Sequence, residues 1–281
     1  MKKQTKLCTY VLCLAILIMA TPVLNARAEQ GTPIKVNEIA NGSDSIYGSG
    51  APLEHSNNPD ARFQSGGIDH THQYIVANAL SILNNDKGNS IFNDELNAGI
   101  LMEATDWPDK LGNETDYGTF SGHFYDPDTG KNWIGQSSPT AQTRAESYYQ
   151  NAVTLYKLGD VSAAMDFLGK GTHYVSDMNE PHHASNLTAI NSNHTEFEKF
   201  VDETRTSYKI KGNTLSSQLY DTAAKSEIDD LSYSAAKYAK ALSEEAQNKS
   251  TYLSAADKSV QHAIQSVTQY IYKFGNEVGI Y

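Results

Sequence analysis

Four histidines and several carboxylates lie within a short stretch of this sequence, between Gly171 and Glu198. Residues four positions apart share one face of a helix, so His173 with Asp177, and His194 with Glu198, can each direct an imidazole and a carboxylate at one point. Imidazole and carboxylate ligands without any thiolate favour a catalytic zinc site over a cysteine-rich structural one. The spacing therefore predicts a metal site.

Further histidines accompany this cluster. His182 and His183 follow the helix break at Pro181, and His123 lies in a segment rich in aromatic residues, proline and glycine. A single histidine on a helix is more often a core or surface residue than a ligand, and we interpret His262 in that way. Two histidine–carboxylate pairs, a third histidine and a loop histidine are together hard to attribute to chance.

The elements that must position these residues are expected to be helices. Apolar residues recur at helical spacing over about 74–83, after a cap at Asn93-Asp94, and over about 141–158, 161–178, 194–209 and 217–276. A long loop from Trp107 to Gly135 interrupts them, and long loops in compact domains are often functional. Runs of β-branched and aromatic residues alternating with polar ones are nearly missing, so the sequence predicts one compact all-α multi-helix domain.

The N-terminal residues have the features of an export signal. Residues 2–6 are mostly basic or polar, about 7–24 are mostly apolar, and Ala26-Arg27-Ala28 fits a cleavage site. We therefore expect a signal peptide over 1–28 and a secreted protein. Residues 29–62, rich in Gly, Ser, Asn and Pro, are expected to be a propeptide or a disordered segment, which leaves 63–281 as the folded domain. After the signal no apolar run reaches about 20 residues, so no membrane span is expected.

Cysteine content and charge limit the classes of function. Both cysteines, Cys8 and Cys13, lie in the expected signal, so packing and bound metal would have to stabilise the exported chain. The formal charge of −11 becomes −15 when the four basic residues of 1–28 are removed. Such an acidic protein is not expected to bind nucleic-acid backbones, which attract stripes of lysine and arginine.

Several strings in this sequence resemble the bacterial zinc-dependent phospholipases C. They are Thr71-His72 at the start of a helix, TFSGHFYDPD over 119–128, Leu168-Gly169 with His173-Tyr174 and Asp177, Pro181-x-His183-Ala184-x-Asn186, and His194-x-x-x-Glu198-x-Phe200-Val201-Asp202. The resemblance covers roughly residues 63–210. It implies an all-α fold with three zinc ions that hydrolyses phosphatidylcholine-like lipids on the glycerol side of the phosphodiester.

The resemblance also assigns ligands. It implies one zinc bound by His123, His173, Asp177 and a loop aspartate, a second bound by His183, His194 and Glu198, and a third bound by His72, Asp177 and the backbone of the mature N-terminal residue. The loop aspartate is Asp106 or Asp109. Asp109 is favoured because an aromatic-Pro-Asp string marks this ligand in relatives of the fold, and it is also a candidate acid/base. His183 is preferred to His182, which is expected to face solvent or to lie behind the ligands.

The same resemblance gives expectations about processing and substrate. The family usually exposes an N-terminal tryptophan, and Phe63, released by cleavage after Arg62, is the expected substitute here. Phe120 matches an aromatic residue of a cation-binding pocket for choline, although plain core packing is the alternative interpretation. Lys110 stands where the family has a tyrosine, which leaves the head-group preference open.

Two other functions stay open at this point. A single-strand-specific zinc nuclease would share the fold and the trinuclear site, but usually has an aspartate, after a wider histidine gap, where this chain has His194 and Glu198. A secreted metal-binding module without catalysis would require a closed structural site. For a small secreted hydrolase a monomer is the default expectation, with phospholipid at a membrane or micelle surface as its partner.

Overall fold

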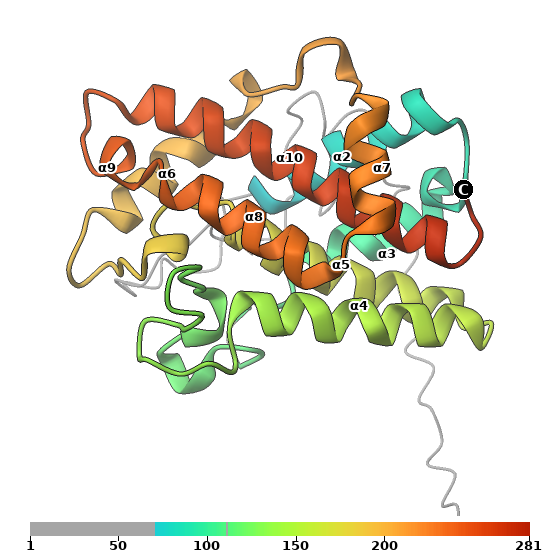
Figure 1. The fold of residues 1–281 in the computed structure, drawn as a ribbon, viewed down its shortest axis with the longest axis horizontal. Coiled ribbons are helices and arrows are strands. Elements are labelled where there is room, and N and C mark those ends of the chain that lie inside the picture. The colour runs from blue at the N-terminus through green and yellow to red at the C-terminus, as the bar shows by residue number, and fades with distance from the viewer. Residues whose placement is uncertain (1–70, 111) are drawn as a thin grey trace, which may run out of the picture. The chain divides into compact units, whose positions relative to one another are not determined.

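The computed structural model describes residues 71–110 and 112–281 (Figure 1). Within these residues the chain forms helices, and its only strand-like feature is an isolated β-bridge between Asp126 and Lys131. The prediction of an all-α fold is confirmed. The expected signal peptide, propeptide and Phe63 precede residue 71 and lie outside the described residues.

The α-helices of the described residues alternate with short 3-10 turns. They are α2 (Thr71–Lys87), α3 (Glu95–Thr105), α4 (Ala141–Lys157), α5 (Val161–Asp177), α6 (His194–Thr204), α7 (Ser217–Lys225), α8 (Ile228–Lys240), α9 (Ser243–Ala246) and α10 (Tyr252–Glu277). The 3-10 turns at Ser121–His123 and His183–Ser185 lie between helices and carry predicted ligands. None of these helices combines the length and the apolar character that crossing a bilayer requires.

Side-chain caps fix where two of the helices begin. Asp94 precedes α3 and Asp160 precedes α5, and each carboxylate accepts the backbone N–H three residues further on at 3.1 Å. Such caps satisfy backbone donors that have no partner in the first turn of a helix. The capped start of α5 sets the register that brings His173 and Asp177 to its last two turns.

Helix α5 is central to the described fold. It packs against α4, α3, α10 and α2 (Figure 1). Its residues Ala164, Met165 and Leu168 are fully buried, as are the two residues at its C-terminal end that are predicted ligands, His173 and Asp177. Because burial of apolar surface is the main force holding such helices together, the predicted ligands His173 and Asp177 stand on a helix that is packed against several others.

The contact between α5 and α3 depends on Gly169. A Cβ atom at this position would lie 2.3 Å from the carbonyl oxygen of Leu101 and 2.7 Å from the Cβ of Ala104. We expect Gly169→Ala to lower the free energy of unfolding by about 1–3 kcal/mol, because backbone rather than a flexible side chain must move. This corresponds to a fall in Tm of about 2–10 °C, measurable by thermal denaturation.

Ser162→Ala is the matched control for this variant. Ser162 is exposed on the first turn of the same helix. In Gly169→Ala, the replacement of glycine by alanine would by itself stabilise the helix by about 0.5–1 kcal/mol, so a net loss of stability must come from the contact with α3. A Gly169→Ala protein as stable as the wild type would show that α3 and α5 can separate without cost.

Candidate metal centre

The predicted ligands converge because they stand at the ends of helices that meet. His72 is in the first turn of α2, Asp177 is the last residue of α5, and His194 is the first residue of α6. His123 and His183 are supplied by the 3-10 turns that precede α4 and α6. All five side chains are buried.

One group of ligand atoms surrounds Asp177. Its Oδ2 lies 2.9 Å from His123 Nδ1 and 3.2 Å from His173 Nε2. Asp109 Oδ1 lies 3.4 Å from that His123 nitrogen and 3.6 Å from that His173 nitrogen. Two carboxylates and two imidazoles therefore face a common point, as the first predicted zinc site requires.

Backbone carbonyls orient the two imidazoles of this group. His173 Nδ1 donates to the Thr105 carbonyl at 2.8 Å, and His123 Nε2 donates to the Glu114 carbonyl at 3.2 Å. A carbonyl only accepts hydrogen bonds, so the second nitrogen of each ring is the one directed at the group. These nitrogens, His173 Nε2 and His123 Nδ1, are 3.1 Å apart. Two nitrogen lone pairs aimed at one point beside two carboxylates suit a divalent metal ion.

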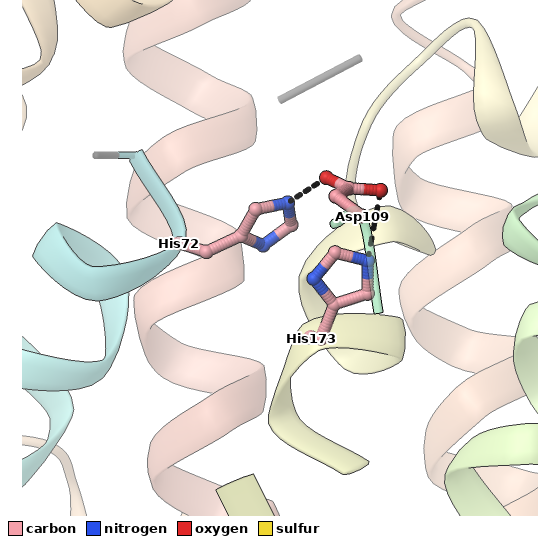
Figure 2. Close-up of side chains that lie close together, drawn as sticks. All are labelled: His72, Asp109 and His173. Atoms are coloured by element: carbon pink, nitrogen blue, oxygen red, sulfur yellow. Dashed lines mark ion pairs between the residues drawn. The ribbon is translucent and has the colours of Figure 1, made fainter. Parts of the chain in front are cut away.

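His72 approaches the same group from α2. Its Nε2 lies 3.9 Å from Asp109 Oδ2 and 3.8 Å from Asp177 Oδ1, and its ring stacks on that of His173 with centroids 4.1 Å apart. Figure 2 shows Asp109 reaching towards both imidazoles. His72 and Asp177, the two side chains that the resemblance assigns to a third zinc, thus lie within 4 Å of each other.

The structure separates the two candidate loop aspartates. Asp109 is within 4 Å of three imidazoles, whereas Asp106 caps α3 and its Oδ2 accepts a hydrogen bond from Gln73 Nε2 at 2.5 Å. The geometry therefore favours Asp109 as the loop ligand. Asp106 instead connects the end of α3 to the first turns of α2, which carry His72.

A second group of ligand atoms joins the 3-10 turn His183–Ser185 to α6. Glu198 Oε1 lies 2.8 Å from His194 Nε2 and 3.4 Å from His183 Nε2. The other nitrogen of His183, Nδ1, lies 3.3 Å from Asp177 Oδ1. His183 therefore stands between the two groups, and Asp177 contacts both.

Glu180 was missed by the sequence interpretation. It is fully buried, and one ligand atom each of Glu180, His183 and His194 lie within 4.8 Å of one another. Of the two expectations for His182, facing solvent or lying behind the ligands, the structure agrees with the second, because its ring is fully buried and its Nδ1 is 2.8 Å from Glu180 Oε1. The density of acids around the histidines was a signal, but no helical spacing singled out Glu180.

His262 contacts other core residues and is not part of this centre. Its Nδ1 is 2.6 Å from Asn179 Oδ1, and its ring stacks on Tyr238 with centroids 3.8 Å apart. Burial lowers the pKa of His262 to about 4, so the ring is neutral at pH 7. A core role is consistent with its interpretation as an ordinary helix histidine.

Burial and neighbouring charges move the pKa values of the clustered histidines in opposite directions. Burial, followed by the adjacent His173, lowers the pKa of His72 to about 3. Burial also acts to lower the pKa of His173, but the carboxylates of Asp177 and Asp109 outweigh it and raise that pKa to about 9. Asp177 likewise holds the pKa of His183 well above its usual value. The metal-free cluster thus keeps protons where a metal ion would bind.

We expect zinc binding to the metal-free protein to release protons at pH 7. His173, with a pKa of about 9, is protonated at pH 7, and an imidazole must lose that proton before its nitrogen can bind a metal. The apparent affinity should therefore rise by about tenfold per pH unit for each proton released, until the pH reaches about 9. Calorimetric titrations in buffers with different ionisation enthalpies count the protons. A binding enthalpy independent of the buffer would contradict the prediction.

Polar contacts hold the loop before α4 in place. Arg144 on α4 pairs with Asp116 at 2.5 Å and donates to the Glu114 carbonyl at 3.3 Å, the same carbonyl that orients His123. Burial opposes the charge of Arg144, but the neighbouring Tyr174, Glu114 and Asp116 outweigh it and raise the pKa. The loop is thereby fixed to α4.

A second set of ion pairs ties the segment after His123 to α8. Lys240 pairs with Asp126 at 2.6 Å and with Asp128 at 2.9 Å, and Lys237 pairs with Asp128 at 2.7 Å. We call these four residues the α8 clamp. Hydrogen bonds from Lys237 and Lys240 lower the pKa of Asp128 to about 2, so this carboxylate is charged at neutral pH.

A pocket of about 130 Å³ opens beside the second group of ligand atoms. It is lined by Gly118, Thr119, Phe124, Trp133, Thr188, Ala189, Ile190 and His194. Phe120 is not among these lining residues. Its ring is 5% exposed, with its centroid 5.9 Å from that of His123. Phe120 therefore packs against a predicted ligand, and Phe124 and Trp133 supply the aromatic surface of the pocket.

The described fold and site define an all-α protein with a buried multi-histidine, multi-carboxylate centre next to an apolar pocket. Residues 71–258 match the model of a family described as zinc dependent phospholipase C. The match includes every predicted ligand from His72 to Glu198. This chain belongs to the zinc-dependent phospholipase C family.

Named relatives and solved structures agree with this assignment. The chain is 30% identical over 236 residues to a phospholipase C of Paraclostridium bifermentans. This aligned region covers 74% of this chain and 59% of the relative. It is 33% identical over 153 residues to a phospholipase C of Bacillus cereus, covering 50% of this chain and 52% of the relative. The alpha toxin of Clostridium absonum matches the structure with a TM-score of 0.68 and 27% identity, over 76% of this chain and 66% of the toxin. The chain thus spans a little over half to two thirds of these proteins.

Proposed function

We propose that this protein is a zinc-dependent phospholipase C. It would hydrolyse the glycerol-side phosphodiester of phosphatidylcholine-like phospholipids and release diacylglycerol and a phosphorylated head group. The observation that carries the proposal is the buried position of Asp177, within 4 Å of four imidazoles from four separate segments. Relatives named phospholipase C support the reaction class, and the adjacent pocket offers room for part of a lipid.

We propose that the donor set holds three zinc ions. His123, His173, Asp177 and Asp109 would hold the first, His183, His194 and Glu198 the second, and His72 and Asp177 the third, together with the backbone of the mature N-terminal residue. Nitrogen and oxygen donors without thiolate suit zinc as a redox-inert Lewis acid. When bound, zinc would supply positive charge that polarises the phosphoryl oxygens and activates water.

The protein's own side chains would hold the metal ions in position and neutralise their charge. Asp177 would tie the sites together, because its two oxygens face different imidazoles. Asp109 Oδ2 points towards His72 and its Oδ1 towards His123, which suits a ligand, and we further propose that it can accept or deliver a proton at the edge of the site. Phe120 is buried against His123 and does not line the pocket, so an aromatic face for a cationic head group would come from Phe124 and Trp133, which do line it.

Export and processing form part of the proposal. The chain would be secreted after removal of the signal peptide over 1–28, and 29–62 would be removed as a propeptide so that Phe63 becomes the N-terminal residue near His72. N-terminal sequencing of the active secreted protein checks this step. Active enzyme that begins at Glu29 or another residue upstream of Phe63 would contradict it.

A parallel assay separates the proposed function from its alternatives. The zinc-loaded protein is incubated with phosphatidylcholine, with sphingomyelin and with single-stranded DNA, each with and without a chelator. Chelator-sensitive release of diacylglycerol supports the phospholipase, and its absence beside cleavage of DNA would identify a nuclease. Zinc binding without hydrolysis of any of the three substrates would leave a metal-binding module.

A further inference from the structure

Glu180 adds a second carboxylate next to the group formed by His183, His194 and Glu198. It follows Asp177 by three residues, between the end of α5 and the 3-10 turn His183–Ser185, and its side chain is fully buried. A buried carboxylate is costly unless it is paired or bound to a metal. His182 pairs with Oε1 of this carboxylate, which leaves Oε2 as the oxygen that could bind a metal ion.

The distances put Glu180 within reach of the same ion as its neighbours. Its Oε2 lies 3.9 Å from His194 Nε2, and it also accepts the backbone N–H of His183 at 2.7 Å. Zinc binds nitrogen and oxygen donors at about 2.0–2.2 Å, so donors of one ion lie about 3–4.5 Å from one another. At 3.9 Å, Glu180 Oε2 and His194 Nε2 meet this condition, and ligand atoms of Glu180, His183 and His194 all lie within 4.8 Å of one another.

A chain of hydrogen bonds fixes the orientation of Glu180. Its Oε1 is 2.8 Å from His182 Nδ1, and His182 Nε2 is 3.1 Å from Asn193 Oδ1. The amide of Asn193 cannot turn round, because its nitrogen donates to the Ala246 carbonyl at 3.0 Å. With Oε1 held by His182, the other oxygen of Glu180 faces His194.

We propose that Glu180 is a fourth protein donor of the second zinc, together with His183, His194 and Glu198, and that His182 and Asn193 orient it. This inference rests on the proposed zinc-binding function of the centre. Two carboxylates and two neutral imidazoles would match the double charge of the ion. The second zinc would then be held by more protein donors than the resemblance implies.

The test measures zinc affinity rather than hydrolysis. Protein purified in its secreted form is equilibrated at graded free zinc set by a competing chelator, and bound zinc is counted by elemental analysis. In the wild type, each zinc equivalent dissociates below a certain free zinc concentration. In Glu180→Gln we expect one equivalent to dissociate already at a concentration more than about 100-fold higher than in the wild type, and the others to be retained. The threshold exceeds the cost of losing an outer-shell partner, which is about 10–100-fold. Glu198→Gln should lose the same equivalent.

Two further variants separate a donor from an orienting residue. His182→Gln removes only the partner of Oε1, so its loss should stay within about 10–100-fold. Glu196→Gln, on an exposed residue of α6 paired with Lys249, is the matched control and should bind zinc as the wild type does. If Glu180→Gln does not fold, Glu180→Asp, which keeps the charge but shortens the side chain, should lose the same equivalent.

Several outcomes would overturn the inference. Wild-type affinity in Glu180→Gln, or a loss no larger than that of His182→Gln, would show that Glu180 is not a donor. Either result leaves the proposed function intact if the wild type binds zinc and hydrolyses lipid. A wild-type protein that binds no zinc would instead refute the proposed function together with the inference.

Discussion

Replacing Asp177 with asparagine is expected to lower phospholipid hydrolysis by about 10³-fold or more and to reduce the zinc content. Asp177 Oδ2 faces His123 and His173, and its Oδ1 faces His72 and His183, so two of the proposed zinc sites share this carboxylate. An amide supplies no negative charge and only one donor oxygen. Loss of about 4 kcal/mol of electrostatic stabilisation at a metal centre corresponds to a rate change of about this size. Steady-state kinetics and elemental analysis measure the two effects.

The control for this variant is Asp166→Asn on the same helix. Asp166 forms a surface pair with Lys170 at 2.6 Å, one turn apart, and its removal should change activity little. Circular dichroism of both variants checks that α5 still forms. An Asp177→Asn protein that retained its full zinc content would contradict the proposal that this carboxylate joins the sites.

Removal of metal should have the largest effect on stability. The centre holds the buried carboxylates of Asp177, Glu180 and Glu198 among buried histidines, and a metal ion would neutralise charges that the metal-free protein must otherwise balance with protons. An ion that binds only the folded state at a free concentration about 1,000-fold above its Kd adds about 4 kcal/mol per site. We therefore expect a chelator to lower the Tm by at least about 10 °C, measured by calorimetry.

Restoring the metal provides the control for this experiment. Excess zinc added after the chelator should return the Tm to its original value, and magnesium, which prefers oxygen donors and octahedral geometry, should not. The Asp177→Asn variant should show a smaller response to the chelator than the wild type. A Tm that is the same with and without chelator would mean that the centre contributes no binding energy to the folded state.

Helices with clear local signals could be predicted from the sequence. The expected ranges 141–158 and 161–178 agree closely with α4 and α5, because amphipathic spacing is local and Gly159 marks the break between them. The range 217–276 is helical as predicted, but it divides into α7, α8, α9 and α10, and the spacing did not indicate these divisions. The chain turns at Ser226 and Leu242 without glycine or proline, so tertiary packing rather than a local signal sets these ends.

In the site, too, contacts between residues of one helix could be predicted from the sequence, whereas contacts between separate segments could not. The pairs His173 with Asp177 and His194 with Glu198 are fixed by helix geometry, so their spacing was sufficient to find them. Glu180 could not be found in this way. It follows the end of α5, and it approaches His194 only because the chain turns between α5 and α6.

The choice between the two loop aspartates also needed the fold. Asp106 and Asp109 are three residues apart at the end of one helix, and sequence alone offered only the aromatic-Pro-Asp string to separate them. The decisive difference is that Asp106 is engaged by Gln73 while Asp109 extends beyond α3 towards the imidazoles. Contacts of this kind depend on how α2 packs against α3, which no local pattern records.

The α8 clamp determines how the polypeptide could be divided. A fragment ending just after Glu198 would contain every predicted side-chain ligand, yet it would lack Lys237 and Lys240 and leave Asp126 and Asp128 as unneutralised neighbouring anions. Repulsion between these anions would loosen the segment that follows His123. We therefore expect a fragment that ends before α8 to hold this segment less firmly than the whole chain does.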